Sequence, residues 1–358
     1  MKKQIIAVIG AGSGGQCMAA HFAMEGYPVR LQDIDEGKIA ALKAAGAIKL
    51  SGALGGEGRP ALVTSDAGEA VRGADIIMVV TTTDAHHAVA KAIAPFVTPE
   101  QIIVLSPGHA GGCLEMMNVL SACGVLKLPP VGECPTLIYG CRQNAPGDIF
   151  VTGVKKSASI ASIPPENAAK IVEALGGFYP QLKAAPNVLS STLSGTGCLL
   201  HVIPTVMSAN KIDAGVSFDF YMEGITESVA ELIERADSER LAVAAAMGAA
   251  PKSLRTWLKD AYSLREDTLY NMLQANKSYV GTKSPKNYSH RFVVEDIACG
   301  FVPISSFGKA FGVPTPVVDA FILLGSILCG TDYMKTGRSV DNLGLAGKTP
   351  EEIIALLT

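Results

Sequence analysis

Three glycines near the start of the chain have the spacing of a dinucleotide-binding turn. An apolar stretch, residues 5–9, runs into Gly10-x-Gly12-x-x-Gly15 and then into a helix-forming segment, and Ser13 within the turn is a further candidate for cofactor binding. The first glycine permits a tight turn, the second lets the backbone approach a pyrophosphate, and the third lets helix and strand pack closely. The start of that helix would offer N–H groups and partial positive charge to the phosphates. A glycine triplet alone is weak, but here its strand and helix context is complete.

A carboxylate stands at the end of the next expected strand, residues 28–33. Asp33 would accept hydrogen bonds from the adenosine ribose hydroxyls and would repel a 2′-phosphate. Residues 34–36 contain no Arg that could bind that phosphate, so the sequence favours NAD(H) as cofactor over NADP(H). Asp35 is a competing candidate for the ribose contact. The alternative for Asp35 is that it caps a helix that begins near Glu36.

Alternating apolar stretches and helical segments must position these groups. Residues 74–80 and 101–105 have strand length and are separated by an expected helix at 85–96. This alternation predicts a parallel, doubly wound sheet, whose ligands bind beyond the carboxyl ends of the strands. Thr81 and Thr82 follow one such strand, so we expect them in the cofactor site. Further strands are expected at residues 136–140, 149–154 and 157–163, and a further helix at 164–177.

Composition restricts the class of protein. The chain has 358 residues, of which 48% are hydrophobic and 18% charged, enough for a large core and two domains. A net charge of −3 without blocks of like charge favours neither nucleic acid nor an anionic membrane as partner. The eight cysteines are scattered without metal-ligand spacing, which predicts reduced thiols, a cytoplasmic location and no metal site. Residues 316–330 are apolar but short and contain Asp319, so they indicate a buried helix rather than a membrane span.

From about residue 186 the pattern is helical. One long helix is expected at 226–247, and another at 189–209 with His201 among apolar neighbours. Pro204 predicts a kink or a helix restart just after the histidine. By itself, a histidine on an apolar helical stretch is more often a core residue than a catalytic one.

Six segments in this half carry a resemblance to the opine dehydrogenase family, which includes octopine, nopaline and N-(1-carboxyethyl)norvaline dehydrogenases. Their order and unusual residue types are more specific than the glycine turn, and the match extends through nearly the whole chain. The segments are Phe218-x-Phe220-Tyr221-x-Glu223-Gly224-Ile225-Thr226-x-Ser228-Val229, Asp237-x-Glu239-Arg240, His290-Arg291-Phe292-x-x-Glu295-Asp296, Val302-Pro303-Ile304, Gly312-Val313-Pro314-Thr315-Pro316-x-x-Asp319 and Gly337-Arg338-Ser339-x-x-x-Leu343-Gly344-Leu345.

The resemblance implies a fold and an activity. The fold would be an N-terminal Rossmann domain, residues 1–185, and an all-helical catalytic domain, residues 186–358, like the C-terminal domain of 6-phosphogluconate dehydrogenase. The activity would be a reductive condensation, in which an amino acid amine and a 2-oxo acid form an imine that NADH reduces.

The resemblance also implies roles for three residues. His201 matches the catalytic histidine of the family and Asp296 the carboxylate that partners it. Such a pair suits hydride transfer, because an imidazole can donate a proton to the heteroatom while the carboxylate fixes its tautomer. Arg291 matches a family arginine and could bind a substrate carboxylate, with a surface or interdomain ion pair as the alternative.

Two departures from the family leave the identity of the amine donor undetermined. The family has Asn one turn before the histidine and Pro directly after it, where this chain has Gly197 and Val202. The sequence does not specify the amino acid, the 2-oxo acid, the product stereochemistry or the oligomeric state, a homodimer among the alternatives. Two other functions remain: a dehydrogenase of simple 2-oxo or hydroxy acids, and a noncatalytic NAD(H)-binding sensor, against which His201 and Asp296 argue.

Overall fold

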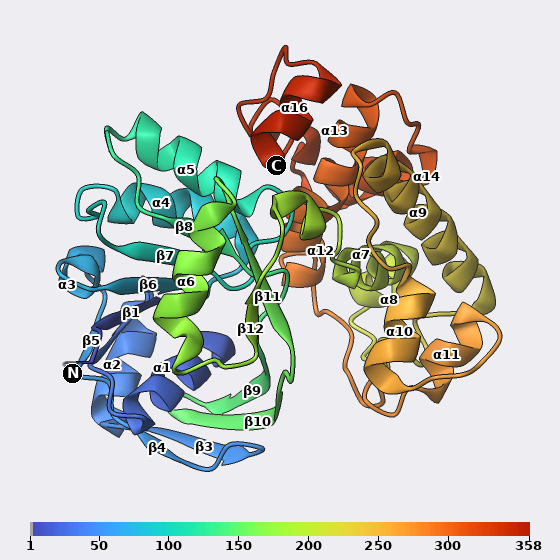
Figure 1. Cartoon of the computed structure of the whole chain (residues 1–358). Helices are drawn as coiled ribbons and strands as arrows, with labels where there is room; N and C mark the ends of the chain where they lie inside the picture. The colour runs from blue at the N-terminus through green and yellow to red at the C-terminus, as the bar shows by residue number, and fades with distance from the viewer. Residues whose placement is uncertain (1–2) are drawn as a thin grey trace. The chain divides into compact units, whose positions relative to one another are not determined.

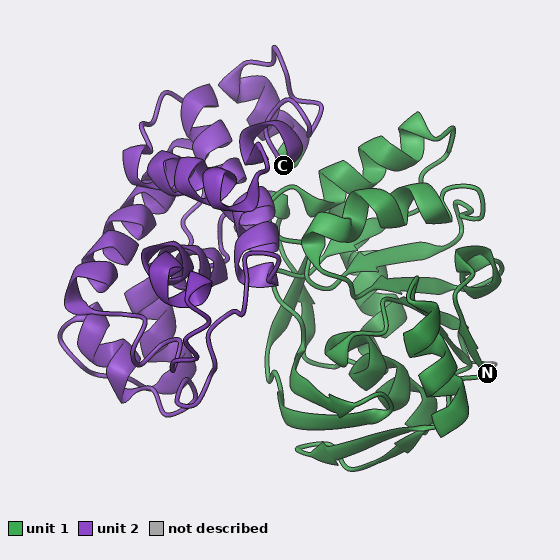
Figure 2. Ribbon diagram, turned by 180° about the vertical axis from the view of Figure 1, so that it is seen from behind, with its two compact units in different colours: residues 1–188, 357–358 green, residues 189–356 purple. Residues whose placement is uncertain are grey.

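The structure is a computed structural model that describes residues 3–358. The chain forms two compact units (Figure 2). Unit 1 comprises Met1–Val188 with Leu357–Thr358, and unit 2 comprises Leu189–Leu356. The division after Val188 lies three residues beyond the boundary expected at residue 185. The membership of the last two residues in unit 1 has no signal in the sequence.

Unit 1 is built on an eight-stranded sheet with the order β12-β11-β8-β7-β6-β1-β2-β5 (Figure 1). The central strands are parallel and carry apolar residues on both faces, as buried strands between helices require. The sheet is not wholly parallel, because β11 pairs with β8 in the antiparallel sense. Its strands are β1 (Ile6–Ile9), β2 (Val29–Gln32), β5 (Leu62–Thr64), β6 (Ile76–Val79), β7 (Ile102–Leu105), β8 (Val131–Glu133), β11 (Ala158–Ser162) and β12 (Leu182–Ala184).

The helices of unit 1 follow the expected alternation. The segment expected as one helix at 85–96 is a short 3₁₀ turn, η1 (Thr83–Ala85), followed by α4 (His86–Ile93). Asp35 caps α2 by accepting a hydrogen bond from the Lys38 N–H at 2.9 Å, which is the alternative given for this residue. The other helices are α1 (Ser13–Met24), α2 (Glu36–Ala45), α3 (Ala67–Val71), α5 (Gly112–Ala122) and α6 (Glu166–Gly176).

A second, four-stranded sheet with the order β4-β3-β10-β9 belongs to unit 1, and the sequence predicts only two of its strands, those expected at 136–140 and 149–154. The strand expected at 136–140 begins at Tyr139 and continues to Ala145, because β9 pairs with β10 as an antiparallel hairpin. The polar residues of β9 carry no apolar alternation that would indicate this pairing. The strands are β3 (Ile48–Gly52), β4 (Gly56–Gly58), β9 (Tyr139–Ala145) and β10 (Asp148–Val154).

Unit 2 is helical. The prediction of a helix at 189–209 is wrong at its start, because α7 covers only Gly197–Met207. Residues 191–196 are rich in Ser, Thr and Gly, whose side chains and flexibility favour turns. The helix continues through Pro204 and is followed by α8, so its restart lies at Ser208 rather than at the histidine. The main helices are α7, α8 (Ala209–Asp213), α9 (Glu227–Ala246), α10 (Leu254–Tyr262), α11 (Leu269–Ala275), α12 (Arg291–Asp296), α13 (Val302–Ala310), α14 (Pro316–Cys329), α15 (Tyr333–Thr336) and α16 (Pro350–Leu357).

The apolar segment at 316–330 forms helix α14 but is not fully buried. Val318, Phe321 and Ile322 face the core, whereas Leu323 and Ile327 are 62% and 69% exposed. The segment is apolar on all sides, so its sequence does not distinguish the exposed face of the helix from the buried one. Within residues 3–358, no helix combines the length and apolar character that crossing a bilayer requires.

Candidate active site

The turn between β1 and α1 depends on its glycines. Gly10 has a φ of 100°, in the region that favours glycine. A Cβ at Gly15 would lie 1.7 Å from the carbonyl oxygen of Gly10, so a larger residue would push α1 away from the strand. A Cβ at Gly12 would meet no atom of the described chain within 4 Å, so the space beside this residue is open. Gly12 is also the N-cap of α1, and it offers no side chain to the N–H groups of the first turn.

Asp33 directly follows β2 and is 9% exposed. Its Oδ2 accepts hydrogen bonds from the Ala11 N–H at 2.7 Å and from Lys38 Nζ at 2.8 Å, and its Oδ1 accepts from the Asp35 N–H at 3.0 Å. Burial by itself would raise the pKa of Asp33, but the hydrogen bonds from Lys38 and the two backbone groups outweigh it and lower the pKa. Asp33 is therefore held as a carboxylate beside the glycine turn.

Hydroxyl groups complete this part of unit 1. Thr81 lies two residues after β6, and its Cγ2 would be 2.9 Å from a Cβ at Gly10. Its Oγ1 is buried and has no hydrogen-bond partner within the described structure. Ser13 Oγ accepts a hydrogen bond from the Gln143 N–H at 3.1 Å and keeps its own proton to donate. Thr82, the third hydroxyl residue expected here, is exposed and serves as the N-cap of η1.

These features fit an adenine dinucleotide. The helix start and the open space at Gly12 suit a pyrophosphate, and the Asp33 carboxylate suits the ribose hydroxyls. The orphaned Thr81 hydroxyl would gain a partner from a polar ligand, which would remove the cost of its burial. Lys38 was not expected from the sequence, although a Lys at the first turn of α2 could fold back onto Asp33.

In unit 2, His201 and Asp296 are hydrogen-bonded. His201 lies in α7 and Asp296 is the last residue of α12, two helices that pack on each other. His201 Nδ1 and Asp296 Oδ2 are 2.8 Å apart, and their side chains are 14% and 8% exposed. The carboxylate can accept only if Nδ1 carries the proton, so it selects that tautomer and leaves Nε2 for proton transfer. A π-helical turn, η3 (Ile297–Phe301), begins directly after Asp296, and such turns are frequent at functional sites.

Aromatic side chains fix the imidazole on two further sides. Phe292 stacks on the His201 ring with centroids 3.8 Å apart and an interplanar angle of 13°. The Tyr221 hydroxyl lies 3.1 Å from His201 Nε2. Neither contact was foreseen as part of the site, although both residues stand in segments that carry the family resemblance.

Arg291, on the same short helix as Asp296, projects largely into solvent. Its side chain is 57% exposed, and it makes an ion pair of 3.6 Å with Glu295. The Glu295 side chain is 5% exposed, but the pair is long and its guanidinium is solvated, so it contributes little to stability. The guanidinium also lies near the Phe292 ring that covers His201, with 5.8 Å between Cζ and the ring centroid. Arg291 is thus close to the histidine but is not hydrogen-bonded to it.

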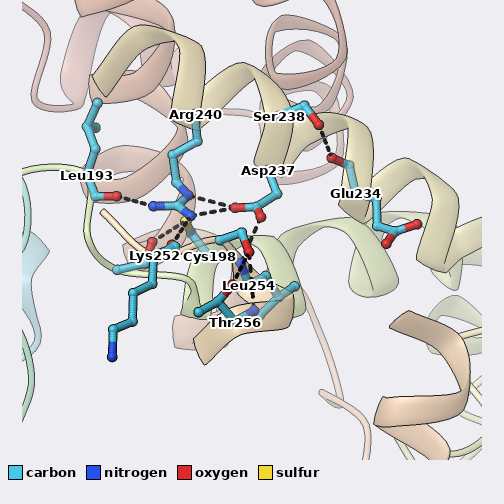
Figure 3. A network of polar contacts seen from close by, with 11 residues as sticks. Leu193, Cys198, Glu234, Asp237, Ser238, Arg240, Lys252, Leu254 and Thr256 are labelled. Atoms are coloured by element: carbon cyan, nitrogen blue, oxygen red, sulfur yellow. Dashed lines mark hydrogen bonds and ion pairs between the residues drawn. The ribbon is translucent and has the colours of Figure 1, made fainter. Parts of the chain in front are cut away.

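A buried ion pair supports the segment that leads into α7 (Figure 3). The Arg240 guanidinium, 0% exposed, donates two hydrogen bonds to Asp237 Oδ1 and further ones to the carbonyls of Leu193 and Lys252. Asp237 Oδ2 also accepts from the Leu254 N–H at 2.7 Å. Both residues stand in segments that carry the resemblance, but the charge pattern of this helix predicts a solvated face. That prediction is wrong for Asp237 and Arg240, which are buried because they join three chain segments.

Comparison with known proteins identifies the family. The chain is 37% identical over 350 residues to an opine dehydrogenase from Arthrobacter sp. (strain 1C), which covers 98% of this chain and 97% of that protein. This chain belongs to the opine dehydrogenase family. Residues 184–329 match the alpha-helical domain of NAD/NADP octopine/nopaline dehydrogenase, and residues 5–109 match the NAD binding domain of 6-phosphogluconate dehydrogenase.

Solved structures agree on the fold of this opine dehydrogenase family member. Octopine dehydrogenase with NADH and L-arginine has a TM-score of 0.76, and octopine dehydrogenase with NADH and pyruvate has a TM-score of 0.73. Each is 21% identical and covers 98% of both chains. The expected arrangement of a Rossmann sheet followed by a helical domain is confirmed.

The departures at Gly197 and Val202 affect the surroundings of the histidine differently. Gly197 is the first residue of α7, and a Cβ there would lie 3.6 Å from His201 Cε1 and 3.8 Å from Nδ1. A side chain at this position would therefore pass along the edge of the imidazole, whereas glycine leaves that edge open. Val202 is 0% exposed and belongs to the core, so its difference from the family is one of packing.

Proposed function

We propose that this protein is an NADH-dependent opine dehydrogenase that joins an amino acid and a 2-oxo acid. The proposal is supported by family membership, by the dinucleotide features of unit 1 and above all by the His201–Asp296 pair. The related octopine dehydrogenase structures contain NADH with L-arginine or with pyruvate, which are an amino acid and a 2-oxo acid.

The residues of the two proposed sites have separate roles in the reaction. Bound NADH would supply a hydride to the imine carbon. Gly10, Gly12, Ser13, Gly15, Asp33, Thr81 and Thr82 are the residues that we propose to hold it. His201 accepts a proton from the substrate ammonium as the amine attacks, and returns a proton to the heteroatom as water leaves or as the C=N bond is reduced. Asp296 stabilises the imidazolium that forms between these events and keeps the Nδ1 proton, which leaves Nε2 for proton transfer.

Arg291 is the proposed anchor for a substrate carboxylate. Both substrates and the product carry carboxylates, and a guanidinium binds such a group through two parallel hydrogen bonds. The exposure of Arg291 and its weak tie to Glu295 leave its donors available for such a group. The helices α12 and α7 would then hold the carboxylate anchor and the proton donor on neighbouring elements.

Cysteine usage supports a location in the cytoplasm. All eight cysteines, which lie within the described part of the chain, are free thiols. Cys17, Cys113, Cys134, Cys198 and Cys299 are buried, as expected of thiols used as small apolar residues. A reducing compartment is where such thiols persist.

The test is a matrix of amino acids against 2-oxo acids, with NADH oxidation followed by absorbance and with wells that lack either substrate. We expect turnover only where an amine and a 2-oxo acid are both present, because two carbon skeletons must be joined before reduction. Comparable turnover of a 2-oxo acid alone would replace this proposal with a simple 2-oxo acid dehydrogenase. Binding of NADH without any turnover would favour a noncatalytic sensor.

A further inference from the structure

The neighbours of His201 leave only one nitrogen of its ring for proton exchange. Nδ1 is engaged by Asp296 at 2.8 Å, and one face of the ring is covered by Phe292 at a centroid distance of 3.8 Å. Nε2 is the nitrogen left for exchange with a substrate, and the Tyr221 hydroxyl lies 3.1 Å from it. A proton that leaves Nε2 along its existing hydrogen bond therefore arrives at the tyrosine oxygen.

The hydroxyl of Tyr221 is held in place by its ring. The ring stacks on Tyr279 with centroids 4.2 Å apart and meets the edge of Phe220 at 5.0 Å. The residue is 6% exposed. Burial, together with the nearby Asp296 carboxylate, raises the pKa of Tyr221 well above its usual value. The side chain thus stays a neutral hydroxyl, which can accept one proton only while it gives up another.

We propose that Tyr221 is a further catalytic residue, whose hydroxyl relays the proton between His201 Nε2 and the reacting heteroatom of the substrate. This inference rests on the proposed function. It adds a third side chain to the His201–Asp296 pair and places the substrate nitrogen or oxygen against the tyrosine hydroxyl.

The relay conserves protons and charge. As the substrate heteroatom takes the proton of the Tyr221 O–H, the tyrosine oxygen takes the Nε2 proton of the imidazolium. The products of this step are a protonated heteroatom, an intact tyrosine and a neutral imidazole that still donates its Nδ1 proton to Asp296. The same hydroxyl works in reverse when His201 accepts a proton from the substrate ammonium.

The decisive variant is Tyr221→Phe, which keeps the ring and its stacking and removes only the hydroxyl. We expect kcat to fall by about tenfold or more, since a positioned proton donor contributes on this scale, with the NADH dissociation constant unchanged. Tyr279→Phe is the matched control, because it removes a hydroxyl from the ring stacked on Tyr221 while the hydroxyl at His201 Nε2 stays. Its kcat should remain within twofold of the unmodified protein.

Two readouts separate a relay from a structural role. Single-turnover reduction in mixtures of H₂O and D₂O should show a curved rate dependence for the unmodified protein and Tyr279→Phe, because two protons move together. It should become linear in Tyr221→Phe. The ¹⁵N signal of His201 Nε2 in the ligand-free protein should shift in Tyr221→Phe alone, which tests the contact without turnover.

The outcomes distinguish the relay from the function on which it rests. An unchanged kcat in Tyr221→Phe would show that Nε2 donates directly, and it would overturn the relay alone. A lower kcat with a curved rate dependence retained would give Tyr221 a structural role, and would also overturn the relay. Absence of turnover in the unmodified protein, in the full substrate matrix, would overturn the proposed function and the relay with it.

Discussion

Single residues carry the proposed chemistry, and their chemical state follows from what touches them. His201 is useful for proton transfer because a carboxylate on a neighbouring helix defines which nitrogen is free. An isolated histidine in the same apolar helix would be a core residue, as the sequence alone suggests. The pairing could be anticipated only from the family resemblance, because 95 residues separate its partners.

Removing either member of the pair should slow the chemical step. We expect His201→Ala and Asp296→Asn each to lower kcat by about 10²-fold or more, because the first removes the proton donor and the second no longer stabilises its imidazolium. The double variant should lose little beyond the worse single variant, since residues that act as one unit are not additive. Steady-state kinetics with saturating NADH and both substrates would measure this.

A structure with cofactor and both substrates bound would test the pairing of His201 with Asp296. If the His201 ring lay more than one water molecule away from Asp296 in that complex, the pairing could not support catalysis. Multiplicative losses in the double variant would likewise show that the two residues act separately.

Cofactor choice is also decided at single residues. Asp33 opposes a 2′-phosphate, whereas Lys38, 2.8 Å from its Oδ2, would attract one if the carboxylate were absent. We therefore expect NADH to bind more tightly than NADPH, and Asp33→Ser to narrow the difference by about 1–3 kcal/mol, the scale of a hydrogen bond to a charged group. Fluorescence titration of both cofactors measures the two dissociation constants.

Lys38 supplies the matched control. In Asp33→Ser combined with Lys38→Gln, the freed ammonium is gone, so part of the preference against NADPH should return. Equal affinity of the unmodified protein for NADH and NADPH would remove the role assigned to Asp33.

Helices and strands position these residues. An element could be predicted where its sequence signal lies within a short stretch of the chain. The strand β1, the turn at Gly10 and helix α1 could be predicted because apolar pattern and glycine spacing are short-range features. The pairing of β3, β4, β9 and β10 into a second sheet could not, because β3 and β10 lie about 100 residues apart in the sequence. The start of α7 was also missed, since Leu193 lies in a left-handed conformation that the buried Arg240 side chain holds from α9.

The open space at Gly12 gives a test of the turn between β1 and α1. We expect Gly12→Ala to leave the melting temperature of the ligand-free protein unchanged, because its Cβ meets no atom of residues 3–358 within 4 Å and its φ of −71° suits alanine. The NADH dissociation constant should rise by about tenfold or more, because the methyl group would stand where the pyrophosphate approaches the backbone. Thermal melting and NADH titration measure the two effects.

Gly153→Ala is the comparison variant in the same unit, since a Cβ there also has open space among the described residues. It should change neither quantity. A Gly12→Ala protein with unaltered NADH affinity would show that the cofactor does not pass beside this glycine.

At the scale of the whole chain, the residues proposed for the cofactor and for proton transfer belong to different compact units. Asp33 and the glycine turn are in unit 1, and His201, Asp296 and Arg291 are in unit 2. Composition and helical periodicity predicted a change near residue 186, because local patterns report where strands give way to helices. The grouping of residues 357–358 with unit 1 has no signal in any local pattern of the sequence.

This division predicts that defects in the two units combine independently. Asp33→Ser acts through NADH affinity and His201→Ala through the chemical step, so the double variant should show the NADH dissociation constant of the first and the kcat of the second. Because the two free-energy changes then add to within about 0.5 kcal/mol, as for sites without shared partners, the product of the single losses in kcat/KM gives the double loss. Direct titration of NADH is required beside kinetics, since KM equals the dissociation constant only when chemistry is slow. A double variant much more active than that product would mean that the hydride donor and the proton donor are coupled before chemistry, and would contradict the separation of roles between the units.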